Sequence, residues 1–243
     1  MPSPFRRLHP AWAVAALTLL ALIAGAAFRS TTGALFAPLE SEFGWTRTGT
    51  SGAVTLNLVV YGLTAPFAAA AMERFGIKHV VVAGLALTAL GSGLTVFMDS
   101  LWQLWVLWGL FVGTGTGVMA LVFGSIVANR WFATRRGLVM GLFSGANACG
   151  QLVFLPAVVA LAQDPGWRAA ALATALVAAL IIPLFALFFA DSPAQRGLLP
   201  YGAPPSSSPG PTADDGGAPA SAAPAHGGPP AEPAGRMAVR VLR

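Results

Sequence analysis

Long apolar runs alternate with short polar breaks through the first 190 residues of the chain. Each run approaches or exceeds the roughly 20 residues with which a helix crosses the hydrocarbon core of a bilayer. Six such runs can be counted, at 11–36, 51–71, 80–98, 101–127, 137–161 and 169–190. The first run is too long for the apolar region of a signal peptide, so we expect it to be retained as a span. The pattern predicts an all-α membrane protein with six transmembrane helices.

The breaks between the runs carry the charged residues and predict an orientation. Lysine and arginine are enriched in the short cytoplasmic loops of membrane proteins. If the N-terminus is cytoplasmic, only Arg47 and Arg168 fall on the outer side. The inner segments then hold eight basic residues: Arg6, Arg7, Arg74, Lys78, Arg130, Arg135, Arg136 and Arg196. This bias predicts that both termini are cytoplasmic.

The character of the chain changes after the sixth run. Residues 200–235 are rich in Pro, Gly, Ala and Ser, so they bury too little apolar surface to offset the entropy cost of ordering. We therefore predict four parts. These are a cytoplasmic N-terminus at 1–10, a transmembrane bundle at 11–192, a disordered cytoplasmic linker at 193–235 and a short closing segment at 236–243.

Composition narrows the range of functions. Charged residues make up only 9% of the chain, whereas a soluble domain carries roughly 25%. The net charge of +5 comes from basic loops between apolar runs, which is unlike the wet basic face of a protein that binds nucleic acid. Cys149 is the only cysteine, which excludes an internal disulfide. No cluster of histidine, cysteine and carboxylate residues suggests a metal site, and we expect no cofactor.

Several stretches resemble the N-terminal half of a major facilitator superfamily transporter. MERFGIKHV, at 72–80, is similar to the superfamily signature between spans two and three. Glu73, Arg74, Gly76 and Lys78 stand at its acidic, arginine, glycine and first basic positions. EFGWTRTGTSGAV, ANRWFATRRGLVMGLFSGANACG, GWRAA and DSPAQRGLLPYGA resemble, in order and spacing, the bacterial monocarboxylate-porter and oxalate/formate-antiporter-like branch.

Three positions depart from patterns known in the superfamily. Ala69 stands where the loop signature usually has a glycine. Gly109 stands where drug/proton antiporters carry an arginine, and Gly145 is followed by Ala146 where they carry a Gly-Pro pair. The last two departures disfavour a multidrug antiporter.

The resemblance implies two inverted three-helix repeats and alternating access around a site near the membrane midplane. It also implies secondary active transport of a small monocarboxylate-like anion across a bacterial inner membrane. The partners would be the lipid bilayer, the carboxylate, and a missing C-terminal six-helix half or a second copy of the chain. RMAVRVLR, at 236–243, resembles the lead-in to a seventh span, which favours a truncated transporter. An inactive fragment and a self-associating half-transporter are the alternatives.

Arg29 lies inside the first apolar run. A charged side chain in a span costs about 2.5–3.5 kcal/mol by insertion measurements, and it usually faces the bundle interior or a water-filled cavity. Guanidinium binds a carboxylate through two parallel hydrogen bonds. The resemblance places a substrate-binding basic residue of the monocarboxylate porters at this position. The alternative is that Arg29 snorkels to the outer headgroups, but the polar residues at 30–33 favour the substrate role.

Two pairs of polar residues share a helix face with spacing of four. Asn57 and Tyr61 lie in the second run, and Asn147 and Gln151 lie in the fifth. Each pair can hydrogen-bond a substrate, or it can make ordinary interhelical hydrogen bonds. No Asp or Glu lies within a predicted span, so we expect no proton-coupling carboxylate in this half.

Two further sets of residues are candidates for helix contact and conformational change. Glycines at a spacing of four predict close helix packing in the fourth and fifth runs: Gly109, Gly113, Gly117, Gly137, Gly141 and Gly145. The resemblance implies that Glu73, Arg74, Gly76 and Lys78 form a cytoplasmic latch that breaks on inward opening. The alternative is positive-inside topology with a local surface ion pair, which contributes little.

An intramembrane enzyme is the remote alternative. GLFSGA in a six-span chain resembles a rhomboid-type protease with Ser144 as nucleophile, and that chemistry requires a histidine base inside the membrane. His9, His79 and His226 all lie outside the predicted spans. We therefore expect a transporter and not an enzyme.

Overall fold

The computed structural model describes residues 9–204, apart from the side chains of residues 30–32, 34, 36 and 165. Six helical stretches in this part are long and apolar enough to cross a membrane: Pro10–Arg29, Arg47–Phe75, Ile77–Phe97, Leu101–Trp131, Arg136–Asp164 and Trp167–Phe188. The described residues contain no strand, and their one β-bridge joins Phe132 to Tyr201. The predicted all-α class with six transmembrane helices is confirmed. Most of the predicted linker and all of segment 236–243 lie outside the described residues.

The elements follow the six spans in order. The first three spans are α1 (Pro10–Phe43), α2 (Arg47–Phe75) and α3 (Ile77–Leu94), the last ending in the 3-10 turn η1 (Thr95–Phe97). The fourth comprises α4 (Leu101–Leu104), the π-helix η2 (Trp105–Val112), α5 (Gly113–Val118) and α6 (Leu121–Trp131). The fifth and sixth are α7 (Arg136–Leu161) with η3 (Ala162–Gly166), and α8 (Trp167–Phe188) with η4 (Pro193–Arg196) after it.

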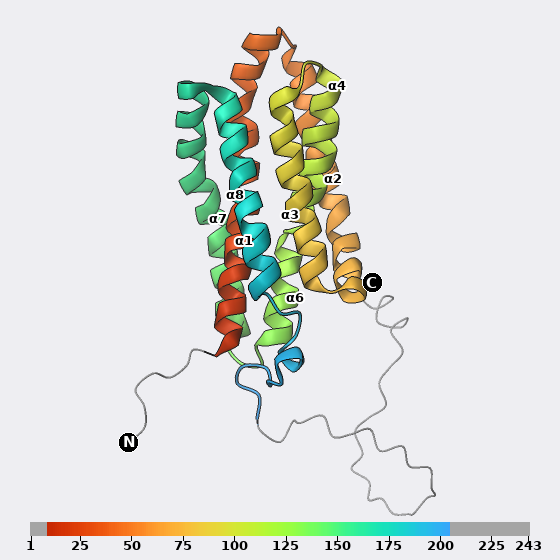
Figure 1. The fold of residues 1–243 in the computed structure, drawn as a ribbon, viewed down its shortest axis with the longest axis vertical. Coiled ribbons are helices and arrows are strands. Elements are labelled where there is room, and N and C mark those ends of the chain that lie inside the picture. Colours follow the sequence, from red (N-terminus) through yellow and green to blue (C-terminus); the bar gives the residue numbers. More distant parts are fainter. Residues whose placement is uncertain (1–8, 205–243) are drawn as a thin grey trace, which may run out of the picture. The chain divides into compact units, whose positions relative to one another are not determined.

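The way the spans pair shows the internal symmetry of the bundle (Figure 1). The most extensive contacts join α1 to α7, α3 to α8, and α2 to α5 and η2. In two three-helix repeats, span one corresponds to span four, span two to span five and span three to span six. The contact between spans one and five then corresponds to the contact between spans four and two. The pair of spans three and six maps onto itself. This is the pairing expected of two three-helix repeats related by a pseudo-two-fold axis.

The first helix is longer than the predicted span because nothing stops it before Gly44. Pro10 occupies the first turn, where the missing N–H of a proline costs nothing, and His9 Nδ1 caps the amide of Ala11. The helix ends at Phe43, after which Gly44 has a φ of 65°, a left-handed conformation that glycine adopts without strain. α2 starts at Arg47, directly after Thr46, whose hydroxyl accepts a hydrogen bond from the amide of Gly49.

Span four is broken, whereas the sequence predicts one continuous helix over 101–127. The helix stops at Val118, and Ala120 has an extended backbone with a ψ of 169° before α6 begins at Leu121. Gly25 of α1 faces this break, because a Cβ atom at Gly25 would lie 3.4 Å from Met119 Cβ. The break therefore lies against α1, one helical turn from Arg29.

The glycines of span four bring α2 and the fourth span into close contact. A Cβ atom at Gly113 would lie 3.1 Å from the carbonyl oxygen of Asn57, and one at Gly117 would lie 3.0 Å from that of Tyr61. At Gly109 the added atom would lie 2.8 Å from Leu56 Cδ2. Small residues at this spacing let two helix backbones approach closely.

Three glycines of α7 face away from the other described helices. Gly137, Gly141 and Gly145 are exposed, and an added Cβ atom at any of them would meet no described atom within 4 Å. α7 meets α1 through its opposite face, where a Cβ atom at Gly150 would lie 3.0 Å from Ala26 Cβ. Their role in helix packing stays a prediction, because a spacing of four identifies a face but not its direction.

The described chain after α8, which belongs to the predicted linker, packs against the bundle. Tyr201 accepts a hydrogen bond from Ala133 N at 2.9 Å and donates its own amide to Trp131 O at 2.8 Å. Its ring lies 5.4 to 5.9 Å from the rings of His9, Trp12 and Phe132. This aromatic cluster joins the start of α1, the α6–α7 turn and the segment after α8.

Candidate functional site

Arg29 and Tyr61 form one polar contact between α1 and α2. Arg29 Nη1 donates a hydrogen bond of 3.0 Å to the Tyr61 hydroxyl oxygen. The guanidinium carbon also lies 4.5 Å from the centroid of the Tyr61 ring. A cation over an aromatic face is attracted by about 0.5–1 kcal/mol when exposed and by about 2 kcal/mol or more when desolvated. Tyr61 therefore restricts where the half-buried guanidinium can lie.

The contact lies at mid-depth in the bundle. Tyr61 is 14 residues from each end of α2, which begins at Arg47 and ends at Phe75. At a rise of about 1.5 Å per residue, that is about 21 Å from either end of the helix. This distance exceeds the reach of an arginine side chain, so the position argues against snorkelling to the headgroups.

The charge of Arg29 is not balanced by an acidic side chain in the described part of the chain. Within residues 9–204, the one ion pair recorded joins Arg168 to Glu42. The acidic residues nearest in sequence, Glu40 and Glu42, follow in the last turn of α1. A permanently charged guanidinium at mid-depth is thus held by an aromatic ring and a hydroxyl, which leave its charge uncompensated.

Asn57 takes the packing role that the sequence left open. Its Nδ2 donates a hydrogen bond of 2.7 Å to the carbonyl oxygen of Trp108, in the π-helix of span four. The residue is 7% exposed. A buried amide bonded in this way stabilises the α2–span four contact and has little access to a substrate. Asn57 and Tyr61 therefore differ in their contacts: Asn57 bonds span four, and Tyr61 bonds Arg29 of α1.

Asn147 and Gln151 lie on α7 beside the residues that contact α1. Both are half-buried, and they flank Ala146 and Gly150 on the buried face. The close approach of Gly150 to Ala26 places this part of α7 about 5 Å along the helix axis from the level of Arg29. Gln151 lies near the level of Arg29, whereas Asn147 lies one turn further toward the start of α7.

The predicted latch residues contain a contact that the sequence did not indicate. Gly76 precedes α3 with a φ of 88° and has no side chain to cap that helix. Asp191, after α8, caps the helix instead. Its Oδ1 accepts a hydrogen bond of 2.6 Å from the backbone N of Lys78. A carboxylate at a helix N-terminus satisfies an unpaired amide and complements the helix dipole. A Cβ atom at position 76 would lie 2.8 Å from Asp191 Oδ2, so glycine is required here.

The side chains of the latch sequence make fewer contacts than its backbone. Glu73 and Arg74 are exposed, and neither joins an ion pair within residues 9–204. The Arg74 guanidinium lies 5.3 Å from the ring of Phe75. The local ion pair considered in the sequence is therefore not seen in the described residues, while Gly76 and Lys78 connect the start of α3 to the end of α8.

A second polar contact joins the far ends of α1 and α8. Glu42 Oε2 accepts a hydrogen bond of 2.5 Å from Trp167 Nε1, and Glu42 Oε1 forms an ion pair of 2.7 Å with Arg168. The hydrogen bond from Trp167, followed by the interaction with Arg168, lowers the pKa of the Glu42 carboxyl below its usual value. Trp167 and Arg168 belong to the stretch GWRAA, so the resemblance in sequence pointed to the region but not to Glu42.

Six membrane-length helices in paired repeats, with a cation at mid-depth, are the features of a multi-pass membrane protein built from two inverted repeats. Residues 17–230 match the family model of the Major Facilitator Superfamily, and the chain belongs to this family. The match confirms the family expected from the loop signature. Its members are transporters and not enzymes, which excludes the intramembrane protease.

Relatives of known name support the same family. The chain is 30% identical over 187 residues to the oxalate:formate antiporter of Oxalobacter formigenes, covering 76% of this chain and 43% of that protein. It is 33% identical over 151 residues to monocarboxylate transporter 11 of Mus musculus, covering 61% of this chain and 33% of the relative. The MFS-type transporter YhjX of Escherichia coli is 30% identical over 145 residues, which cover 60% of this chain and 35% of that protein. The chain thus spans between a third and a half of the length of these relatives.

Proposed function

We propose that this chain forms one six-helix half of a secondary active transporter for a small organic anion, with a monocarboxylate as the simplest substrate. The observation that carries the proposal is Arg29, held at mid-depth by Tyr61 with no acidic partner in residues 9–204. A substrate carboxylate would supply the missing negative charge through two parallel hydrogen bonds. The names of the relatives, an oxalate:formate antiporter and monocarboxylate transporters, support a carboxylate as the ligand.

Tyr61 has a positioning role in this proposal. It orients the guanidinium through its hydroxyl and its ring face, so that the remaining edge of the fork is presented to the anion. Asn147 and Gln151 are the amides at a comparable depth that can hydrogen-bond the rest of the substrate. Asn57 is assigned to helix packing through Trp108 instead.

Alternating access requires a second six-helix unit facing this one. The exposed glycine face of α7 is a smooth surface on which such a unit could move, whether it is a C-terminal half or a second copy. The basic bias of the loops supports cytoplasmic termini in a bacterial inner membrane. On that side, the turn from Glu73 to Lys78 with Asp191 would act as the latch, since it fixes α3 to the end of α8.

The proposal is tested by binding of formate and oxalate to the full chain in lipid nanodiscs, with methyl formate and dimethyl oxalate as uncharged controls. We expect the anions to bind and the esters not to bind. Hydrogen bonds to a charged group contribute about 1.5–3 kcal/mol, so Arg29→Ala should weaken anion binding about 10- to 150-fold. Arg29→Lys keeps the charge but loses the planar pair of donors, so its anion affinity should lie between those of wild type and Arg29→Ala. Equal binding by wild type and Arg29→Ala, or equal binding of ester and anion, would refute the assignment.

A further inference from the structure

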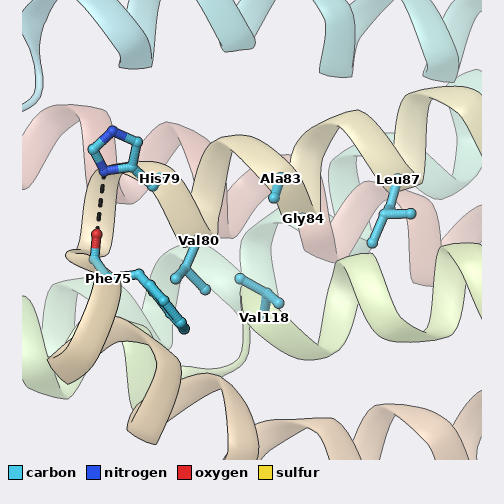
Figure 2. A pocket seen from close by; sticks show the side chains of 7 residues that line it. All are labelled: Phe75, His79, Val80, Ala83, Gly84, Leu87 and Val118. Atoms are coloured by element: carbon cyan, nitrogen blue, oxygen red, sulfur yellow. Dashed lines mark hydrogen bonds between the residues drawn. The ribbon is translucent and has the colours of Figure 1, made fainter.

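We infer that a groove along α3 binds the acyl chain of an anionic phospholipid, with the headgroup at the α2–α3 turn. The groove lies between the end of α2 and the first half of α3, with α5 as its floor, and has a volume of about 570 Å³. Figure 2 shows His79 at one end, Leu87 at the other, and Ala83 and Gly84 between them. The inference rests on membrane insertion of the family and is independent of the proposed substrate.

The groove has the shape and lining of a hydrocarbon site. Its walls are apolar apart from His79, and its hollow arises because Ala83 is small while Phe75 and Val118 project beside it (Figure 2). His79 to Leu87 spans eight residues, or about 12 Å of helix. That length is close to half of the roughly 30 Å hydrocarbon core, so the groove runs from the membrane surface toward the midplane.

The groove opens on the outer surface of the described bundle. α3 uses one face for α8, where the Ser92 hydroxyl donates to Ala171 O, and another for α5, where Gly84 meets Val118. The groove lies between α2 and α3 and opens away from α5. An apolar hollow of this kind does not hold water stably, and an empty one loses dispersion contacts. A lipid chain from the surrounding leaflet restores those contacts.

The mouth of the groove selects the headgroup. His79 lines it, Arg74 rests over the ring of Phe75, which also lines it, and Lys78 precedes His79 in α3. Two acidic side chains lie nearby. Asp191 is bound to the amide of Lys78, and Glu73 is exposed. Basic pockets beside transmembrane helices bind anionic headgroups, and each lysine or arginine near the surface contributes measurably. A phosphatidylglycerol headgroup meets this charge better than a zwitterionic phosphatidylethanolamine.

The test uses native mass spectrometry of the full chain in detergent, titrated with phosphatidylglycerol or with phosphatidylethanolamine of the same acyl chains. We expect wild type to retain one phosphatidylglycerol at least fivefold more tightly than phosphatidylethanolamine. Ala83→Trp should weaken phosphatidylglycerol binding at least tenfold, because the indole fills the groove. Ala179→Trp, on the exposed face of α8 and outside the groove, is the matched control and should bind as wild type.

A second variant separates lipid binding from folding. Arg74→Gln with Lys78→Gln changes only accessible side chains and leaves the Lys78 amide free to bond Asp191. It should remove most of the preference for phosphatidylglycerol, because each lysine or arginine near the surface contributes to it. Arg130→Gln, a basic residue outside the groove, should leave the preference unchanged. The inference is overturned by equal binding of the two lipids to wild type, by retention of the lipid in Ala83→Trp, or by an equal loss in Ala179→Trp.

Discussion

The contact between Asp191 and the start of α3 yields a quantitative prediction. Asp191→Ala removes the charge-assisted hydrogen bond of 2.6 Å to Lys78 N and leaves the amides of the first turn of α3 without their carboxylate. Such bonds contribute about 1.5–3 kcal/mol, and we take the lower value because Asp191 is half-exposed. About 1.5 kcal/mol in a chain of this size corresponds to a fall of about 3–6 °C in the melting temperature.

The assay combines thermal melting in detergent with amide hydrogen exchange. Exchange should speed up in the first turn of α3 and stay unchanged in α7. Asp99→Ala, an exposed carboxylate outside this contact, is the control. If Asp191→Ala melts with wild type and α3 exchanges at the same rate, the carboxylate does not stabilise this helix end and the reasoning fails.

Gly76→Ala completes a double-mutant cycle with Asp191→Ala. In wild type the new methyl group meets Asp191 at 2.8 Å and also carries the strain of a φ of 88°. In the Asp191→Ala background only the backbone strain remains. We therefore expect Gly76→Ala to lower the melting temperature more in wild type than in that background, and strict additivity would show that the two residues are not coupled.

Three further predictions concern other contacts. Tyr61→Phe keeps the ring under Arg29 and loses the hydroxyl, so formate affinity should fall a few-fold in the nanodisc binding assay, and Tyr61→Ala should cost more. Gly113→Leu should lower the melting temperature markedly because it separates α2 from span four, while Gly141→Leu on the exposed face should change it little; equal losses would contradict the packing described. The pKa of Glu42 is lowered in the folded chain, so its stabilisation is present above the usual carboxyl pKa of 4.5 and is lost as pH falls through the lowered value. Wild type should thus lose a small stabilisation in acid melting curves, and Glu42→Gln should lack that step.

The sequence predicts the spans well because transmembrane length is set by bilayer thickness and by the need to satisfy every backbone group inside the segment. It predicts the position of Arg29 for the same reason, since a charge in an apolar run is conspicuous. The break at Met119 and Ala120 was missed because those residues are apolar and break no pattern. Hydropathy predicts whether a segment lies in the membrane, but it does not predict the backbone angles at which a helix breaks.

The direction of a helix face is the second limit of the sequence. Gly113 and Gly141 stand in identical repeats, yet the first meets Asn57 and the second meets no described atom. Membrane helices present small residues both to neighbours in the bundle and to surfaces outside it, so spacing alone does not decide between them. Asp191 was missed for a related reason: it lies 113 residues from Lys78, and only the fold brings the carboxylate to that amide.

The cluster around Tyr201 has a consequence for whatever follows it in sequence. Because this residue is fixed between the start of α1 and the α6–α7 turn, the next segment leaves from a defined point under the bundle and not from the end of α8. Loss of the Tyr201 contacts would move that starting point back toward the end of α8 and would leave the contacts between the six spans in place.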